Sequence, residues 1–217
     1  MTDIPVLFSA PMVRALLEGR KTMTRRLAWD IARIGPEFPG KPSRWQRVKP
    51  GDRLWVRESL DLRGDRPDLP IWQASYRADG APLDLSVPAN LAFAEGKSGQ
   101  RRGRFINSIH MPRSFSRLTL IVETVKIERL QDISEADAIA EGVLSWRDDW
   151  SQKQAAEMLL RGTEASVETG ARAPAVRLFY LLWTSLHGQE SWAETPTIVA
   201  ISFRVIKSNI DSAEVAS

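Results

Sequence analysis

The order in which strand-like and helix-like patterns follow each other constrains the fold of this chain more than any single motif. Its clearest strand is Arg117–Glu128, where apolar residues alternate with polar ones in the second half. Other apolar runs typical of strands occur at 4–8, 53–58, 71–78 and 197–205, and helical spacing occurs at 10–18, 135–142, 150–160 and 175–186. Strands and helices do not alternate one by one, as they would in a parallel βαβ sheet. We therefore expect an α+β fold whose mixed sheet curls into a small β-barrel with peripheral helices.

Glycines and a serine mark where two of these helices begin and end. Gly19 follows the helix predicted over 10–18, and Gly142 closes a short helix that begins after Ser134. A serine at that position favours an N-cap, in which its hydroxyl accepts a backbone N–H of the first turn. The sequence Lys49–Asp52, which reads Lys-Pro-Gly-Asp, is a strong turn signal, so the next strand should begin at Arg53.

Length and composition indicate the broad class of protein. A chain of 217 residues with 43% hydrophobic residues is long enough for one domain with insertions, or for two small domains. It has no apolar run long enough to cross a membrane, and Met1–Pro5 lacks the pattern that opens a signal peptide. The chain contains no cysteine, which excludes disulfides, thiolate metal sites and cysteine nucleophiles. We expect a cytoplasmic protein that does not associate with membranes.

Charge is unevenly distributed, although the formal net charge is only +3. Basic residues cluster within 20–26, 44–57 and 97–104, and acidic residues cluster within 123–141. Separate basic stretches are typical of proteins that bind phosphates. The alternative is a solvated surface of mixed charge, and the sequence leaves both interpretations open.

The chain holds eight tryptophans, an unusually large number. Most should pack inside the protein, because the indole ring buries a large apolar area. Two of them stand among basic residues, since Trp45 lies between Arg44 and Arg47 and Trp55 lies between Arg53 and Arg57. A tryptophan in such a setting can stack on a nucleic-acid base.

Metal and cofactor sites receive no support from the sequence. The two histidines, His110 and His187, lie far apart, and neither has a second nitrogen ligand at helical spacing. The glycine motifs that bind nucleotide phosphates or dinucleotides are absent from the sequence. We therefore expect no metal site and no cofactor.

The segment Gly19–Arg26 contains a candidate catalytic pair, Lys21 and Thr24. A threonine hydroxyl becomes a useful nucleophile when a base takes its proton, and a lysine can be that base if burial or positive neighbours lower its pKa. Glu141 is a third candidate, because an acid in the last turn of a helix opposes the helix dipole and a nearby lysine would relieve it. The alternative is that Lys21 is an ordinary surface lysine and Thr24 an ordinary strand residue.

Four motifs occur in an order and at spacings that resemble the ASCH domain family. They are Gly19–Arg26, Lys49–Leu54, Asp132–Gly142 and Ile201–Phe203. The stretch Ser108–Arg113 is similar to the corresponding part of longer ASCH proteins, which phages and prophages often carry. The resemblance implies the PUA-like fold, a small β-barrel flanked by helices. It also implies one domain over 1–207, with insertions at about 60–115 and 145–175, and a flexible tail over 208–217.

The family is regarded as RNA-interacting, and one small bacterial branch removes the acyl group from N4-acetylcytidine. The site of that branch is a lysine, a threonine three residues later and a distant glutamate, which Lys21, Thr24 and Glu141 match. The resemblance implies that Thr24 attacks the amide carbonyl, that Lys21 takes and relays the proton, and that Glu141 orients Lys21 or the substrate. This chain is longer than those amidohydrolases, so its insertions could cap the pocket, change the substrate or form an RNA groove.

We expect the ligand to be a modified nucleoside or an RNA, bound by a monomer or weak dimer. The residues expected to bind it are Arg20, Arg25, Arg26, Trp55, Arg57, His110 and Arg113. Three other functions remain open: a non-catalytic RNA-binding module, a metal-independent ribonuclease that uses Lys21 or His110, and a phage accessory protein that acts through a protein partner.

Overall fold

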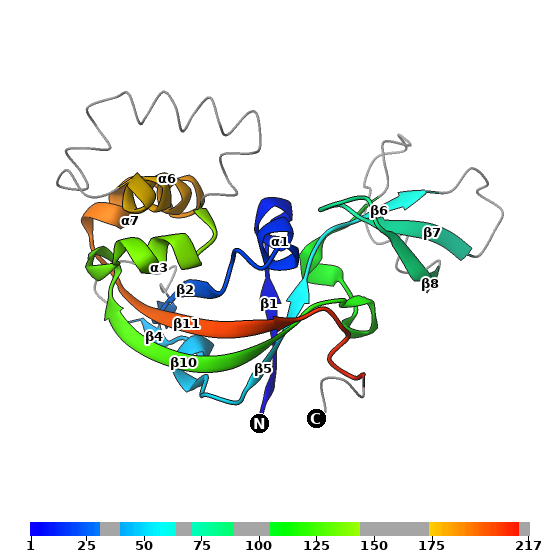
Figure 1. The fold of residues 1–217 in the computed structure, drawn as a ribbon, viewed down its shortest axis with the longest axis horizontal. Helices are drawn as coiled ribbons and strands as arrows, with labels where there is room; N and C mark the ends of the chain where they lie inside the picture. The colour runs from blue at the N-terminus through cyan, green and yellow to red at the C-terminus, as the bar shows by residue number, and fades with distance from the viewer. Residues whose placement is uncertain (31–39, 64–70, 89–104, 144–173, 213–217) are drawn as a thin grey trace. The chain divides into compact units, whose positions relative to one another are not determined.

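The computed structural model describes residues 1–30, 40–63, 71–88, 105–143 and 174–212 (Figure 1). Contacts group the chain into two compact units, each assembled from segments that are distant in the sequence. Unit 1 comprises Met1–Leu17, Arg53–Leu120 and Val205–Ser217. Unit 2 comprises Glu18–Asp52 and Ile121–Arg204.

The described residues form strands, α-helices and short 3₁₀ helices. The strands are β1 (Asp3–Leu7), β2 (Met23–Leu27), β3 (Trp29–Asp30), β4 (Lys41–Pro42), β5 (Arg53–Arg57), β6 (Leu60–Arg63), β7 (Ile71–Tyr76), β8 (Pro82–Pro88), β9 (Phe105–Ile106), β10 (Thr119–Arg129) and β11 (Thr197–Ile206). The α-helices are α1 (Ala10–Leu17), α3 (Glu135–Ala140), α6 (Pro174–His187) and α7 (Glu190–Ala193). The 3₁₀ helices are η1 (Arg44–Arg47), η2 (Ser108–His110), η3 (Arg113–Phe115) and η4 (Leu130–Asp132).

The strands form a five-stranded mixed sheet, a four-stranded sheet and a two-stranded pair, which makes the fold α+β as the sequence predicts. The strand order of the larger sheet is β1-β5-β10-β11-β2, with β1 parallel to β5 and β2 antiparallel to β11. The four-stranded sheet has the order β8-β7-β6-β9, and β3 pairs with β4. Each order is open among the described strands, where no pairing closes a barrel.

Most of the predicted elements are confirmed within the described residues. The helices predicted over 10–18, 135–142 and 175–186 correspond to α1, α3 and α6. Gly19 follows α1 with φ of 73°, a left-handed conformation that glycine adopts without strain. Ser134 caps α3 through its hydroxyl, which accepts the Asp137 N–H at 3.1 Å. The helix predicted over 150–160 lies outside the described residues.

One hydrophobic cluster of unit 1 is built from the four-stranded sheet and the segment that follows β9. Leu60 and Leu62 of β6 are buried and separated by the less buried Asp61, as the two-residue period of a strand requires. They belong to a cluster that also contains Ala74, Tyr76, Leu83, Ile106, Met111 and Phe115. The Tyr76 hydroxyl donates to the Phe115 carbonyl at 2.9 Å, so the polar end of this aromatic side chain is satisfied inside the core.

A partly buried ion cluster centred on Arg117 also belongs to unit 1. The Arg117 guanidinium donates to both carboxylate oxygens of Glu58, each at 2.9 Å, and to both oxygens of Asp79 at 2.8 and 3.1 Å. It also stacks over the Tyr76 ring at 3.8 Å. Burial raises the pKa of Glu58, and the Arg117 contact partly opposes that rise. With two bidentate partners, Arg117 is held by its contacts within unit 1.

The first strand and the end of the described chain are joined by a second ion network in unit 1. Asp3 of β1 accepts from Arg53 at 2.7 and 2.8 Å and from Arg113 at 2.6 Å, and Arg113 also pairs with Asp211. The expected tail starts at residue 208, and its first residues make contacts: Ile210 is 1% exposed, and Asn209 donates to the Ser116 carbonyl at 2.7 Å. Residues 213–217 lie outside the described residues.

We expect Asp3→Asn to lower the free energy of unfolding at pH 7 by about 1–2 kcal/mol, because the charged acceptor of two guanidinium groups is lost. The hydrogen bond from Arg53 is the largest cause that lowers the pKa of Asp3 below its ordinary value of 3.8. The stabilisation is therefore present above pH 3.8 and is lost as the pH falls through the pKa of the folded state.

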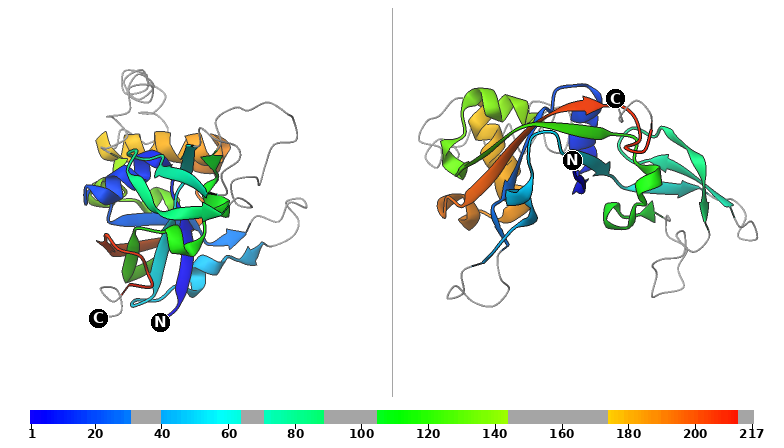
Figure 2. Two further views of the ribbon diagram at one scale, coloured as in Figure 1. Left: turned by 90° about the vertical axis from the view of Figure 1, so that its right-hand side faces the viewer. Right: turned by 90° about the horizontal axis from the view of Figure 1, so that it is seen from below.

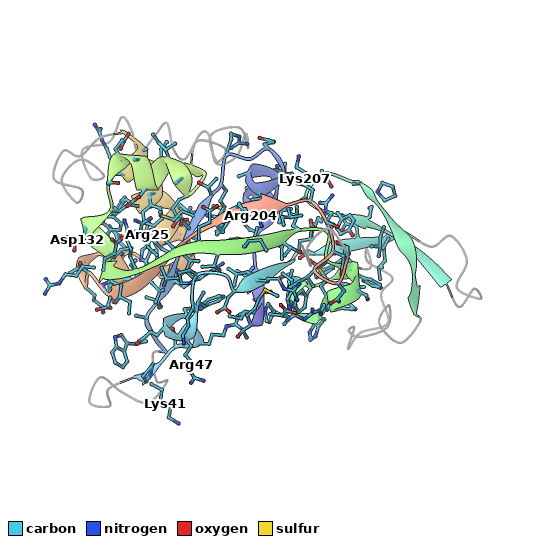
Figure 3. All side chains as sticks on the ribbon, turned by 60° about the horizontal axis from the view of Figure 1, so that its bottom comes forward. Arg25, Lys41, Arg47, Asp132, Arg204 and Lys207 are labelled. Atoms are coloured by element: carbon cyan, nitrogen blue, oxygen red, sulfur yellow. The ribbon has the colours of Figure 1, made fainter. Side chains whose placement is uncertain are left out.

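Urea unfolding at pH 7 and near pH 3 measures this difference. The gap between wild type and Asp3→Asn should shrink at the lower pH, and a gap that stays constant would contradict the account. Asp132→Asn is the control, because Asp132 is exposed and lies in unit 2 (Figure 3). Its effect should stay within about 0.5 kcal/mol.

Unit 2 packs α3 and α6 side by side, as Figures 1 and 2 show. The Glu135 carboxylate of α3 accepts the first-turn N–H groups of Ala175 and Val176 at 2.9 and 3.1 Å, and thereby caps the start of α6. Aromatic side chains fill the space around α6, and Tyr180 meets Trp192 edge to face at 5.2 Å. These contacts fix the position of α3, whose last residues carry one side of the candidate site.

Among the described residues, no helix is both long enough and apolar enough to span a bilayer.

Candidate functional site

Lys21 and Glu141 form a buried ion pair in unit 2, although 120 residues separate them in the sequence. The Lys21 Nζ donates to Glu141 Oε2 at 2.7 Å, to the Glu141 carbonyl at 2.9 Å and to the Met23 carbonyl at 2.8 Å. An ammonium group has three N–H donors, and these acceptors match all of them. The contact that the resemblance implies between the two residues is therefore present.

Backbone hydrogen bonds on both sides of Lys21 hold it in this place. The Thr22 N–H donates to the Ala140 carbonyl at the end of α3 at 2.8 Å, and the Thr22 carbonyl accepts the Phe203 N–H of β11 at 2.9 Å. Glu141 is fixed in turn, because its N–H donates to the Asp137 carbonyl at 2.9 Å. The left-handed turn at Gly19 leads the chain from α1 into this segment. The ammonium therefore meets the carboxylate at the point where β2 begins and α3 ends.

Thr24 lies in β2, opposite Ile201 of β11, and its side chain is buried. The carbonyl that accepts from Lys21 Nζ belongs to Met23, so the ammonium contacts the peptide group that precedes Thr24. The exposed fractions of Lys21, Thr24 and Glu141 are 1%, 3% and 3%. A substrate reaches the Thr24 hydroxyl only if the side chains that cover it move.

The electrostatic setting of Lys21 suits a proton-transfer group. Burial is the largest influence on Lys21 and lowers its pKa, because the charged form is poorly solvated there. The positive charges of Arg26 and Arg25 lower the pKa further, whereas Glu141 opposes these effects. The direction of the shift brings the amine closer to a form that can accept a proton at neutral pH.

Arg25, predicted as a substrate-binding residue, contacts three carboxylates. Its guanidinium donates to Glu128 and Asp137 at 2.9 Å each and to Glu141 at 3.4 Å, and it lies 5.8 Å from the Phe179 ring centre. Figure 3 shows the labelled Arg25 beside α3. Glu128 and Asp137 are site neighbours that the sequence analysis did not single out. The signal that indicates them is the acidic cluster within 123–141, which is complementary to the basic cluster within 20–26.

The other two arginines of the basic segment have different surroundings. Arg20 pairs with Glu18, close to it in the sequence. Arg26 is half-buried and lies over the Trp45 ring at 5.5 Å. Burial lowers the pKa of Arg26 to about 10, with Glu141 opposing that shift, so the group stays charged at neutral pH.

The remaining predicted binding residues belong to unit 1, whereas Lys21, Thr24 and Glu141 belong to unit 2. Trp55 is buried in β5, and Arg57 lies over its ring at 5.3 Å and donates to the Ile109 carbonyl. His110 is exposed in η2. Arg113 is held by Asp3 and Asp211.

In the part of the chain that the structure describes, no group of three or more His, Asp or Glu side chains is placed to hold a metal ion.

Comparisons with known proteins give one low-similarity structural match. No family model and no curated protein matches the chain. Among solved structures, protein EF3133 from Enterococcus faecalis V583, described as a member of the family DUF984, matches with a TM-score of 0.34 and 13% identity. The match covers 96% of this chain and 82% of the other chain.

Proposed function

We propose that this protein is an ASCH-type amidohydrolase with a PUA-like fold, which removes acyl groups from N4-acylated cytidine. The observation that supports the proposal most is the buried Lys21–Glu141 pair at 2.7 Å, attached through the Met23 carbonyl to the strand that carries Thr24. An ion pair costs free energy to bury, and a buried lysine of lowered pKa is a frequent property of functional sites.

Catalysis in this proposal begins with a proton transfer inside the ion pair. Glu141 Oε2 takes one proton from the Lys21 ammonium, and the neutral amine then removes the proton of the Thr24 hydroxyl. The Thr24 oxygen attacks the acyl carbonyl, and Lys21 delivers its proton to the cytosine N4 as the C–N bond breaks. Water then attacks the acyl-threonine ester while Lys21 takes its proton. As the ester C–O bond breaks, Lys21 returns that proton to the Thr24 oxygen and the carboxylic acid leaves. Glu141 then gives its proton back to Lys21, which restores the ion pair.

The surrounding charges assist the proton transfer. Arg25 Nη1 lies 3.4 Å from Glu141 Oε1, whereas Lys21 Nζ donates to the other oxygen, Oε2, at 2.7 Å. The Arg25 contact fixes the orientation of the carboxylate, so that Oε2 stays directed at the amine. Arg25 and Arg26 add positive charge that favours the neutral form of Lys21. In this proposal Arg25 is a positioning residue, which does not touch the substrate.

The substrate is a modified nucleoside, free or within RNA, and the protein acts in the cytoplasm as a monomer or weak dimer. The main rival is a non-catalytic RNA-binding module, in which Lys21 and Glu141 only join β2 to α3. Thr24 separates the two functions, because a binding module does not need its hydroxyl.

Incubation of the purified wild-type protein with N4-acetylcytidine tests the proposal. We expect stoichiometric release of cytidine and acetate, followed by chromatography, with repeated turnover in the absence of added metal or cofactor. N4-acetylcytidine within a short RNA is a second substrate, which distinguishes a nucleoside enzyme from an RNA enzyme. Folded protein that releases cytidine from neither substrate would contradict the proposal and favour the binding module.

A further inference from the structure

Unit 2 contains two basic segments, 20–26 and 41–49, which differ in their exposure to solvent. Lys21 and Arg25 within 20–26 are buried and contact carboxylates. The following basic segment, 41–49, contains Lys41, Arg44, Arg47 and Lys49, which are all exposed. It contains no acidic residue, and Asp30 pairs with its Lys41 across the β3–β4 ladder. These four exposed cations make the segment a candidate contact for a polyanion.

Two tryptophans accompany these cations. Trp29 of β3 is 45% exposed, which is unusual for the largest apolar side chain. Trp45 of η1 is half-buried, with the guanidinium of Arg44 over its ring at 4.5 Å and that of Arg26 at 5.5 Å. We call these residues the Trp29–Arg47 surface: Trp29, Lys41, Arg44, Trp45 and Arg47.

The backbone that carries this surface is fixed to the sheet. Trp29 pairs with Pro42 across the β3–β4 ladder. The Ser43 N–H donates to the Ala28 carbonyl at 2.8 Å, and the Ser43 hydroxyl donates to the Leu27 carbonyl at 2.7 Å. Val48, buried at the end of η1, anchors the other side. The aromatic and basic side chains are therefore presented from a held framework, which lowers the entropic cost of binding.

We propose that the Trp29–Arg47 surface binds single-stranded nucleic acid. Lys41, Arg44 and Arg47 contact the phosphates, and the exposed ring of Trp29 stacks on an unpaired base. Stacking requires a base that is splayed out of a helix, so the chemistry favours a single strand over a duplex. Figure 3 shows Lys41 and Arg47 extending to the same side of unit 2, away from the labelled Arg204 of β11.

This surface does not depend on the hydrolase proposal, because none of its residues belongs to the Lys21, Thr24 and Glu141 site. If the protein is a hydrolase, the surface holds a strand that contains the acylated cytidine. If it is not, the surface still binds the strand. A cation and tryptophan surface also suits an anionic membrane, and the experiment distinguishes the two ligands.

Fluorescence anisotropy with a labelled single-stranded RNA of about 12 nucleotides tests the proposal with the full-length protein. Single-stranded DNA and duplex DNA of the same sequence are further arms, and vesicles that contain an anionic phospholipid are another. We expect binding to single strands that exceeds binding to the duplex and to the vesicles. Tighter binding of RNA than of DNA would identify RNA as the ligand. Equal affinity for single-stranded RNA and DNA would show that the surface contacts phosphates and bases and does not require the 2′-hydroxyl.

Variants assign the binding to this surface. Trp29→Ala should weaken single-strand binding roughly 5- to 100-fold, and Trp29→Phe should retain most of it, because a ring remains for stacking. The double variant Arg44→Ala/Arg47→Ala should reduce the slope of log affinity against log salt by about 1.4, the value for two lost phosphate contacts on a single strand. The matched control is Arg204→Ala, which removes an exposed arginine of the same unit.

Three results would overturn the proposal. One is a loss of affinity per removed charge that is equal in Arg204→Ala and in Arg44→Ala/Arg47→Ala, which would indicate a non-specific effect of net charge. Another is unchanged affinity in Trp29→Ala and in the double arginine variant, which would place the binding elsewhere. The third is stronger binding to duplex DNA or to vesicles than to single strands. Circular dichroism of each variant confirms that it is folded, and Trp29→Phe keeps the test valid if Trp29→Ala fails to fold.

Discussion

Lys21→Met is expected to lower the free energy of unfolding by about 3–5 kcal/mol. The substitution leaves the Glu141 carboxylate buried and without the ammonium that contacts it at 2.7 Å. The Met23 carbonyl also loses the donor that it accepts at 2.8 Å. Arg25 compensates only in part, because it lies 3.4 Å from the other oxygen of Glu141 and also contacts Glu128 and Asp137. Urea unfolding at neutral pH measures the change.

The double variant Lys21→Met/Glu141→Met separates the cost of an unpaired charge from the value of the pair. Replacing both members of a buried ion pair by apolar residues of similar shape is often nearly neutral. The double variant should therefore be more stable than Lys21→Met, although it also lacks the Glu141 carboxylate. Lys126→Met is the control, because Lys126 is exposed on β10, and its effect should stay within about 0.5 kcal/mol. A Lys21→Met variant as stable as wild type would contradict the buried pair.

Thr24→Val is expected to abolish deacylation, with a decrease in kcat of at least about 10³-fold, because it removes the nucleophile. Valine has nearly the shape of threonine and favours strands, so β2 and its pairing with β11 should be preserved. Thr24→Ser keeps a hydroxyl at the same position and should retain much of the activity. The affinity for N4-acetylcytidine should change little in Thr24→Val, since valine keeps the shape of the threonine side chain.

Thr22→Val is the matched control for that experiment. Thr22 lies on the same segment and is exposed, and its hydrogen bonds to Ala140 and Phe203 use backbone atoms, which valine also has. Activity should be nearly unchanged in this variant. Equal losses in Thr22→Val and Thr24→Val would indicate a general disturbance of the segment. Unchanged activity in Thr24→Val would exclude Thr24 as the nucleophile.

Local signals predict much of the fold, because they depend on neighbouring residues. Ser134 marks the start of α3 by its ability to cap, and Gly19 marks the end of α1 by its access to positive φ. The open order of the five-stranded sheet was not predictable in this way, since strand pairing joins residues such as Ile201 and Thr24 that are far apart in the sequence. Sequence patterning favoured a barrel because it shows strands but not how they pair.

For the candidate site, the sequence predicts the main residues but not all of their contacts. Lys21 and Glu141 were candidates from a basic segment and a helix end, a family resemblance matched both, and the structure places them in contact. The contacts of Arg25 with Glu128 and Asp137 were not anticipated, because charge clusters in a sequence do not show which pairs will meet. The same limit applies to the exposed Trp29, because exposure depends on tertiary packing that the local pattern does not contain.

The most direct test of the account is the initial rate of cytidine release from N4-acetylcytidine, measured for wild type and Thr24→Val in parallel. The account predicts repeated turnover by the wild-type protein and no release above background by the folded variant. No release by either protein, or equal release by both, would contradict the central claim that the Thr24 hydroxyl, activated by the buried Lys21–Glu141 pair, cleaves the amide.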